Sequence, residues 1–201
     1  MSHMHTLYVV ATPIGNLGDM THRALEVLGN VLCIAAEDTR VTKKLLTHYD
    51  ISVPLISYHA QSNDGVIEKI IEKLQDGDVA LVTDAGTPGI SDPGSELVAR
   101  VRAAGASVVS VPGASALTAA LSIAGVPVHE FAFIGFLPHK KGRQTLFAEI
   151  AESSRTVVFY ESPHRIMKTL TSLSEVLGED KVVTVCRELT TMHEEVGQGS
   201  A

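Results

Sequence analysis

The sequence predicts an α/β protein built on a parallel sheet, and three observations indicate this fold class. Short apolar runs alternate along the chain with longer amphipathic segments, which implies parallel strands joined by right-handed helical crossovers. The first of these runs, residues 7–11, is apolar on both faces, as strands between two helical layers are. A hydrophobic fraction of 45% is ample for a core, and a charged fraction of 19% argues against disorder.

The apolar runs and the segments between them predict the elements in order. The predicted strands span residues 7–11, 31–36, 54–58, 79–82, 107–111, 131–136, 156–160 and 182–186. The predicted helices span about 21–28, 41–46, 62–75, 95–104, 114–124, 144–151 and 165–177. The clearest helix is 62–75, where apolar residues recur at helical spacing opposite a charged face. Asp19 or Thr21 is expected to cap the first helix.

The regular alternation of apolar runs and helical segments changes after the fifth predicted strand, which predicts two domains. The predicted organisation is an N-terminal parallel α/β domain over residues 5–127, a strand and basic linker over 128–143, and a partial C-terminal α/β domain over 144–201. Two or three strands cannot easily bury their own face, so the second domain is expected to be truncated. The uncharged stretch 107–128 is broken by Pro112-Gly113 and predicts strand, turn and helix rather than a membrane span.

Composition narrows the class of partner. A formal net charge of −7 disfavours a surface that binds nucleic acid over its whole extent, but leaves room for a local basic patch. Cys33 and Cys186 lie far apart in apolar runs, which predicts reduced thiols and a cytoplasmic protein. The nine histidines show no metal-ligand spacing, so no metal is expected.

The most informative stretch is residues 83–94, which follow the apolar run 79–82 and precede a helix. This loop holds three glycines, two prolines and two aspartates. Open α/β sheets bind ligands at the carboxyl ends of their strands, so the stretch predicts a ligand cradle, although Gly-Pro clusters often mark only a turn. The turns at 13–16 and 112–116 repeat the arrangement, and we expect all three on one sheet edge. Neither a dinucleotide fingerprint nor a phosphate-loop motif is present.

Charged residues follow two other strands. Glu37 and Asp38, followed by Arg40, end the second strand; a helix cap with a local Glu–Arg pair is the plain alternative to a catalytic role. His164 in the loop 161–165 could be a base, a phosphate contact or a helix-start residue. The connector 139–143 could bind phosphates or be a solvated hinge.

Five motifs together show a resemblance to a known family. They are residues 12–17, 36–40, 84–94, 135–138 and 159–165. In this order they resemble the ribosomal RNA small-subunit methyltransferase I family, which has the tetrapyrrole-methylase-like fold. The resemblance implies S-adenosylmethionine as methyl donor, bound between two domains, and a homodimer. It also implies 2′-O-methylation of the ribose of a cytidine in small-subunit (16S) ribosomal RNA.

The resemblance also implies site residues. The implied donor-binding residues are Pro13, Ile14, Gly15, Asp84, Ala85, Gly86, Thr87, Pro88, Ile90, Ser115, Ala116 and Leu137. The expected RNA phosphate contacts are Arg40, Lys140, Lys141, Arg143 and Arg165. The candidate bases for activating the 2′-hydroxyl are Glu37, Asp38, Glu161 and His164, among which the sequence does not choose. Two alternatives stay open: a methyltransferase of the same fold acting on a tetrapyrrole or other small molecule, and a non-catalytic cofactor-binding module.

Overall fold

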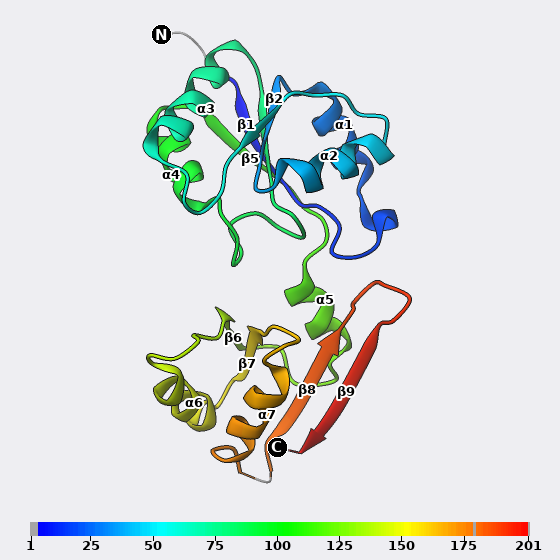
Figure 1. The fold of residues 1–201 in the computed structure, drawn as a ribbon, viewed down its shortest axis with the longest axis vertical. Helices are drawn as coiled ribbons and strands as arrows, with labels where there is room; N and C mark the ends of the chain where they lie inside the picture. Colours follow the sequence, from blue (N-terminus) through cyan, green and yellow to red (C-terminus); the bar gives the residue numbers. More distant parts are fainter. Residues whose placement is uncertain (1–3, 179, 201) are drawn as a thin grey trace. The chain divides into compact units, whose positions relative to one another are not determined.

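The structure is a computed structural model that describes residues 4–178 and 180–200. The chain divides into two compact units, Met1–Ala116 and Leu117–Ala201, and each is described by itself (Figure 1). The aromatic strand and basic linker expected at 128–143 lie within the second unit.

The first unit is built on a five-stranded parallel sheet. Its strands are β1 (Thr6–Val10), β2 (Cys33–Ala36), β3 (Leu55–Ser57), β4 (Val79–Val82) and β5 (Ser107–Val111), in the order β3-β2-β4-β1-β5. All neighbouring strands are parallel, with Leu7 opposite Val79 on one side and Val108 on the other. The predicted parallel α/β sheet is therefore confirmed, and all five strands end at the same edge.

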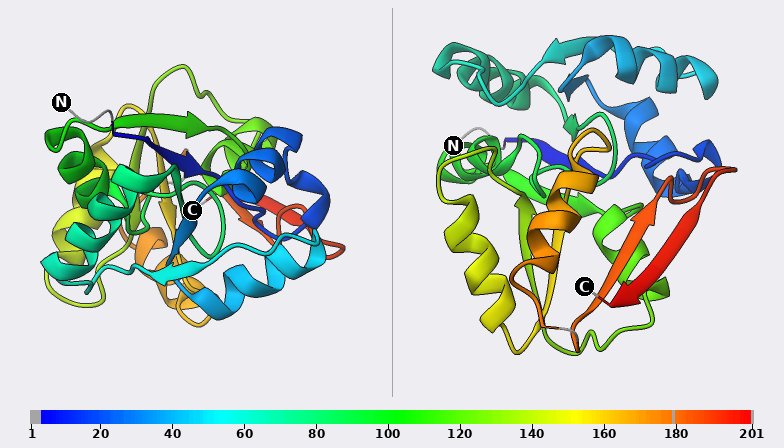
Figure 2. Two further views of the ribbon diagram at one scale, coloured as in Figure 1. Left: turned by 90° about the horizontal axis from the view of Figure 1, so that it is seen from above. Right: turned by 60° about the horizontal axis from the view of Figure 1, so that its bottom comes forward.

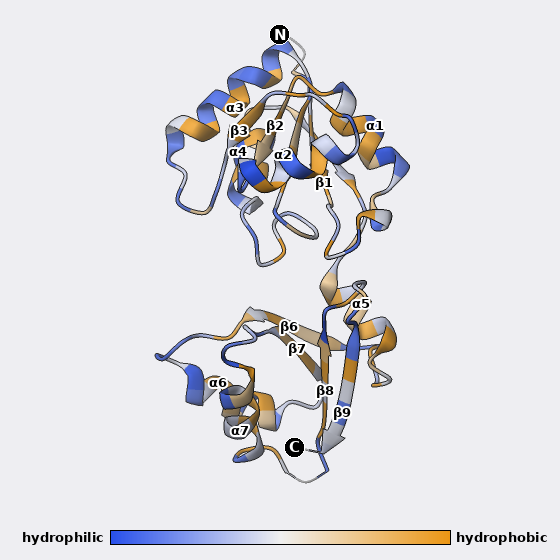
Figure 3. Cartoon of the chain, turned by 45° about the vertical axis from the view of Figure 1, so that its right-hand side comes forward, coloured by the Kyte–Doolittle hydropathy of each residue, from blue (hydrophilic) through white to orange (hydrophobic). Residues whose placement is uncertain are grey.

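Helices cover both faces of this sheet. They are α1 (His22–Asn30), α2 (Thr39–His48), α3 (Asp64–Asp76) and α4 (Ser95–Ala103). The short helix η1 (Leu17–Asp19) lies in the loop after β1 and has no buried residue. Helices α3 and α4 lie on one face, where Ile70 and Leu97 join one buried cluster; α1 and α2 lie on the other, where Leu28 and Leu46 join a second (Figure 1). Strands β2 and β4 are hydrophobic and buried along their whole length between these layers, whereas the helices are polar on their outer sides (Figure 3). Burial on both faces explains why the strands lack an alternating pattern.

Side chains define where the helices begin. The hydroxyl of Thr21 accepts a hydrogen bond from the amide of Ala24 at 3.1 Å, so Thr21, and not Asp19, caps α1. Asn63 caps α3 in the same way, and Gly77 follows its last residue. Each cap satisfies a backbone donor that the helix itself leaves unpaired.

The second unit has two small sheets. Its elements are α5 (Ala116–Ile123), whose first residue ends the first unit, β6 (Phe131–Phe136), α6 (Arg143–Glu152), β7 (Thr156–Tyr160), α7 (Ile166–Ser174), β8 (Val182–Arg187) and β9 (Glu195–Ser200). Strands β6 and β7 are parallel, while β8 and β9 form an antiparallel hairpin, the orange and red ribbons of Figure 2. The small core of this unit centres on Leu137, Phe147 and Leu173.

Two outcomes complete the comparison with the predicted elements. Strand β9 was missed because all six of its residues are exposed and the segment lacks an apolar run. The stretch 107–128 forms β5 and α5, as predicted, and no helix within residues 4–178 and 180–200 is long and apolar enough to cross a membrane.

Candidate functional site

The loops that follow β1, β4 and β5 are joined at the carboxyl edge of the first sheet. The amide of Thr12 donates to the carbonyl of Gly86 at 2.9 Å, and the amide of Gly86 donates back to Thr12 at 3.0 Å. The hydroxyl of Thr87 donates to the carbonyl of Ala114 at 3.2 Å. These bonds link the β4 loop to both neighbouring loops, which confirms that the three predicted turns share one edge.

Gly86 lies where the three loops meet. Its φ of +84° lies in the left-handed region, which glycine adopts without the steric cost of a Cβ. A Cβ at this position would lie 3.4 Å from Cγ2 of Ile14 and 3.9 Å from the carbonyl oxygen of Ala114. Residue 86 therefore brings backbone of the β4 loop close to both other loops.

The predicted donor-binding residues of the first unit all lie in these loops. Pro13, Ile14 and Gly15 follow β1; Asp84, Ala85, Gly86, Thr87, Pro88 and Ile90 follow β4; Ser115 follows β5 and Ala116 begins α5. Ile90 is 43% exposed, although it is apolar. The arrangement brings this predicted set together around one edge of one sheet.

Carboxylates tie the β2 loop to the β4 loop. The amide of Asp84 donates to Oε2 of Glu37 at 3.4 Å, and the amide of Asp38 donates to Oδ1 of Asp84 at 3.0 Å. Each carboxylate thus accepts a backbone donor from the other loop. Glu37 and Asp84 thus link the loops that follow the two adjacent strands β2 and β4 by a pair of hydrogen bonds.

Asp92 is a third carboxyl group in this region, and sequence reasoning did not select it. Burial and the negative charges of Glu37 and Asp84 raise the pKa of Asp92 to about 6, since both effects disfavour the ionised form. The two aspartates of the loop were visible in the sequence, but their proximity to Glu37 depends on the pairing of β2 with β4. Asp92 therefore joins the candidate acid–base groups.

Asp38 acts as a helix cap. Its carboxylate accepts from the amide of Arg40 at 2.8 Å and pairs with the Arg40 guanidinium at 2.6 Å. The hydrogen bonds from the Arg40 side chain and amide lower the pKa of Asp38 to about 2. The local ion pair considered from sequence is thus Asp38–Arg40 rather than Glu37–Arg40, and a carboxylate held in this way is a weak base.

The charged residues of the second unit gather around Glu161. The Glu161 side chain is only 2% exposed and pairs with Arg165 at 2.5 Å and with Arg143 at 3.4 Å. The hydroxyl of Thr169 donates to Glu161 at 2.7 Å. Burial by itself raises the pKa of Glu161, but hydrogen bonds from Thr169 and Ser162 and the nearby arginines outweigh it and hold the pKa below its ordinary value.

The remaining predicted residues of the second unit differ in exposure. Lys140, Lys141 and His164 are exposed, and the amide of His164 donates to the hydroxyl of Ser162. Leu137 is 2% exposed and packs in the core of its own unit with Phe147. Its role toward the donor stays a prediction, as do the phosphate contacts.

The edge of the first sheet fits the methyl donor that the resemblance implies. Carboxylates suit a positively charged sulfonium and can accept hydrogen bonds from ribose hydroxyls. The junction at Gly86 presents backbone at close range. The hydroxyl of Thr83, at the start of the β4 loop, is buried and has no partner within the described residues, and a buried polar group of this kind favours a ligand partner.

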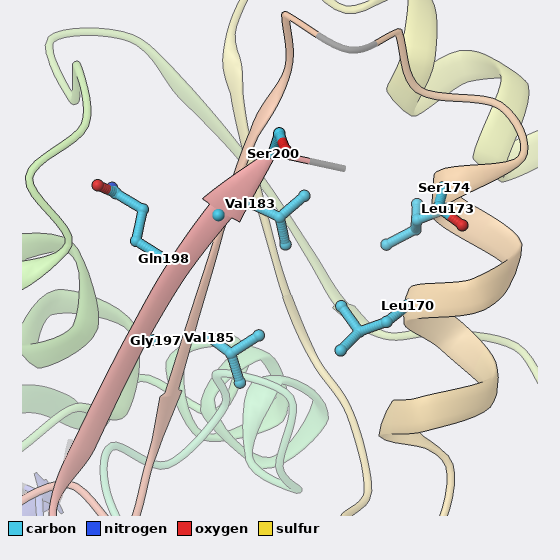
Figure 4. A pocket seen from close by; sticks show the side chains of 9 residues that line it. Leu170, Leu173, Ser174, Val183, Val185, Gly197, Gln198 and Ser200 are labelled. Atoms are coloured by element: carbon cyan, nitrogen blue, oxygen red, sulfur yellow. The ribbon is translucent and has the colours of Figure 1, made fainter.

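A separate groove lies in the second unit between α7 and the β8–β9 hairpin. It has a volume of about 450 Å³. Leu170 and Leu173 on α7 face Val183 and Val185 on β8 across it (Figure 4). None of its lining residues belongs to the predicted site.

Comparison with known proteins identifies the class. Residues 6–201 match the family of tetrapyrrole (corrin/porphyrin) methylases. Two solved structures share the fold. The cobalt precorrin-4 methyltransferase CbiF has a TM-score of 0.70 and 18% sequence identity, and the match covers 99% of this chain and 86% of that one. The methyltransferase CobJ has a TM-score of 0.70 and 21% sequence identity, and the match covers 99% of this chain and 87% of that one. The chain belongs to the tetrapyrrole methylase family, and methyltransferases of this family use S-adenosylmethionine as the methyl donor.

Two curated relatives are similar over nearly the whole chain. The ribosomal RNA small subunit methyltransferase I of Synechocystis sp. is 52% identical over 199 residues, which cover 98% of this chain and 71% of the relative. The protein of the same name from Xylella fastidiosa is 50% identical over 202 residues, covering 100% of this chain and 74% of the relative.

Proposed function

We propose that this protein methylates small-subunit ribosomal RNA, at the 2′-hydroxyl of the ribose of a cytidine, with S-adenosylmethionine as donor. The observation that carries the proposal is that about half of the residues, over nearly the whole chain, are identical to those of relatives named as ribosomal RNA small subunit methyltransferases. The ribose 2′-hydroxyl of a cytidine as acceptor comes from the family resemblance. The 18% and 21% identities to the two precorrin-type methyltransferases support only the shared fold, so a tetrapyrrole substrate is not favoured.

We place the donor on the three joined loops of the first unit. Backbone from the loops at 12–15, 84–90 and 113–116 would hold the nucleoside and methionine parts, with Gly86 at their junction. Asp84 would accept from a ribose hydroxyl or offset the positive charge of the donor. When bound, S-adenosylmethionine supplies an activated methyl group, and the protein supplies alignment, which accounts for much of the acceleration in such displacements.

The base that would accept the proton of the 2′-hydroxyl must have a pKa that suits neutral solution. The low pKa values of Asp38 and Glu161 make these two candidates weak bases. Asp92 has a raised pKa and lies with Glu37 and Asp84 at the edge of the sheet. We therefore favour Asp92, with His164 as the other candidate from the sequence.

Phosphates of the RNA would be bound by local cations, because the net charge of the whole chain is −7. Arg40 is 86% exposed on its side chain, and Lys140 and Lys141 are exposed. The protein is further proposed to act as a homodimer in the cytoplasm, with the assembled subunit as its substrate.

Methyl transfer to small subunits tests the proposal. We expect label from methyl-labelled S-adenosylmethionine to enter the RNA of subunits lacking this modification, and to be found on a ribose 2′-oxygen of a cytidine. Porphyrin precursors serve as the control substrate. Transfer to the precursor but not to the subunit would assign the protein to the other branch of the family.

Calorimetry with S-adenosylmethionine separates an inactive binding module from an enzyme. Binding without transfer to either substrate would support the module, whereas no binding would reject both forms of methyltransferase.

A further inference from the structure

The connector between β6 and α6 is held in place by two arginines. Nη1 of Arg143 donates to the carbonyl of Pro138 at 3.0 Å. Nη1 of Arg165 donates to the carbonyl of Leu137 at 3.3 Å. The two guanidinium groups thus donate hydrogen bonds to consecutive backbone carbonyls, directly after the end of β6.

Glu161 holds both arginines. Its Oε1 pairs with Nη2 of Arg165 at 2.5 Å and accepts from the amide of Ser162 at 2.8 Å. Its Oε2 accepts from the hydroxyl of Thr169 at 2.7 Å and from Nη2 of Arg143 at 3.4 Å. A carboxylate offers about four acceptor positions, so the contacts inside the protein occupy all of them.

The surroundings restrict these side chains further. Thr169 is fully buried and also accepts from Arg143 at 2.5 Å, while the Arg143 guanidinium lies over the ring of Phe147 at 4.8 Å. Arg143 is 11% and Arg165 23% exposed on their side chains. These two cations are therefore engaged inside the protein, unlike the lysines of the connector.

The segment that the arginines anchor carries exposed positive charge. Lys140 and Lys141 extend into solvent just beyond the anchored carbonyls, and the amide of Arg143 donates to the carbonyl of Lys140 at 3.3 Å, which closes a turn. Gly142, with a φ of +80°, precedes the first residue of α6, and no side chain among the described residues caps this helix start. Two ammonium groups at an uncapped helix start suit phosphate oxygens.

We infer that Glu161 is a positioning residue: through Arg143 and Arg165 it fixes the connector that presents Lys140 and Lys141 to the phosphate backbone of the RNA. The inference rests on the proposed function for the identity of the polyanion. It divides the four predicted cationic contacts of the second unit into two lysines that reach the RNA and two arginines that hold the lysines in place. It also removes Glu161 from the candidate bases.

The test compares the wild type with three variants of the same chain. Glu161→Gln keeps an acceptor oxygen but loses the charge that pairs with both arginines. Arg143→Lys keeps the charge but loses the planar fork that reaches Pro138 and Glu161 together. Lys140→Ala combined with Lys141→Ala removes the proposed phosphate contacts, and Lys168→Ala, an exposed lysine on α7, is the control.

The first readout is RNA affinity at several salt concentrations, with deproteinised small-subunit RNA as the probe. The double lysine variant is expected to reduce the slope of log affinity against log salt by about 2, because each lost phosphate contact removes about 1. Glu161→Gln and Arg143→Lys are expected to weaken binding about threefold to tenfold by loosening a preorganised segment. Lys168→Ala should change neither quantity, and all variants should bind S-adenosylmethionine like the wild type.

Hydrogen exchange and kinetics separate positioning from other roles. In Glu161→Gln, amides of residues 139–143 should exchange faster while those around Phe147 and Leu173 stay protected. Loss of protection throughout the second unit would mean that this variant unfolds. In that case the same measurement on Arg143→Lys tests whether the connector is loosened. With subunits as substrate, KM should rise while kcat at saturation stays within about twofold. A base at Glu161 predicts instead a fall in kcat of about a hundredfold or more with KM unchanged, which would overturn the inference.

Failure of the inference is distinguishable from failure of the proposed function. An unchanged salt slope in the double lysine variant would overturn the inference even if the wild type methylates subunits. Salt-dependent RNA binding that responds to all three variants, without methyl transfer by the wild type, would support the inference and reject the proposed reaction.

Discussion

Acidic residues at the edge of the first sheet differ in their contacts, so they are expected to respond differently to substitution. Asp38 is held by Arg40 and by the start of α2. Glu37 and Asp84 accept backbone amides across two loops, and Asp92 is disfavoured in its charged form by burial and by its neighbours. We therefore expect the hydrogen-bond donors around each carboxyl group to determine whether it holds a loop in place or accepts a proton.

Glu37 is expected to hold the β4 loop rather than to accept a proton. Glu37→Gln keeps an oxygen that can accept from Asp84, so affinity for S-adenosylmethionine should stay within about threefold of the wild type. Glu37→Ala leaves this amide without its acceptor, and a hydrogen bond of about 0.5–1.5 kcal/mol corresponds to a loss of roughly twofold to tenfold in affinity. Calorimetry measures both. If Glu37→Gln binds the donor normally but transfers no methyl group, Glu37 is the base instead.

Asp92 is expected to destabilise the protein as pH rises. Its pKa is raised to about 6 in the folded state from 3.8, so between these values the folded state binds more protons and stability falls with increasing pH. Asp92→Asn should therefore raise the melting temperature at pH 8, on the order of 1 kcal/mol of stability. The difference should shrink as the pH falls from 6 and vanish only well below 3.8, where both states are protonated.

Thermal unfolding across this pH range checks the prediction for Asp92. Glu72→Gln, on the exposed side of α3, is the control. A stabilisation by Asp92→Asn that is equal at pH 4 and pH 8 would contradict a titration effect.

At the scale of elements, the β4 loop owes its path to backbone conformation. Gly86, Gly89 and Gly94 all have positive φ, and a Cβ on Gly94 would lie 3.1 Å from the amide nitrogen of Gly89. The loop therefore turns back on itself before α4 begins. Its cross-links to the β1 and β5 loops then hold three strand ends as one surface.

A matched pair of glycine substitutions separates strain from binding. Gly86→Ala and Gly105→Ala place alanine at φ values of +84° and +90°, so each should cost about 1–2 kcal/mol of stability. No atom of the described residues lies within 4 Å of a Cβ at Gly105, whereas at Gly86 the Cβ would lie 3.4 Å from Ile14. Only Gly86→Ala is expected to weaken S-adenosylmethionine binding, by about tenfold or more.

Chemical denaturation and calorimetry on the two glycine variants provide this comparison. Equal donor affinity in both would show that the junction of the three loops does not bind the donor.

At the scale of the whole molecule, the two units differ in the size of their cores. The first unit buries two clusters on opposite faces of one sheet, and the second buries Leu137, Phe147 and Leu173. Two two-stranded sheets provide less area to cover than one five-stranded sheet. The second unit is therefore expected to be the less stable of the two.

Phe147→Ala is expected to unfold the second unit selectively. Phe147 is fully buried, and truncation of such a side chain costs about 3–5 kcal/mol. Hydrogen exchange should show lost protection in β6, β7 and α7, while β1 and β4 stay protected. Simultaneous loss in both units would show that they unfold together.

Sequence alone was sufficient for the fold class and most of the elements, because burial on both faces of a parallel sheet leaves continuous apolar runs. Val79–Val82 was predicted with the observed bounds for this reason. Ser107–Val111 was also predicted with the observed bounds, but its serines are exposed and its signal is the three valines. Strand β9 was not predicted, because its residues are exposed and its order comes from pairing with β8. The three loops that form the candidate site were predictable because glycine and proline mark them along the chain.

The sequence by itself therefore determined which segments form the turns. Because parallel strands end at the same edge of a sheet, it also determined that these turns share one edge. Tertiary structure alone decided what each charged group contacts. It placed Asp92 near Glu37, paired Arg40 with Asp38, and turned Arg143 and Arg165 inward to Glu161. The physical reason is that a carboxylate's strength as a base depends on burial and on donors brought from distant parts of the chain, and neither is written in its local sequence.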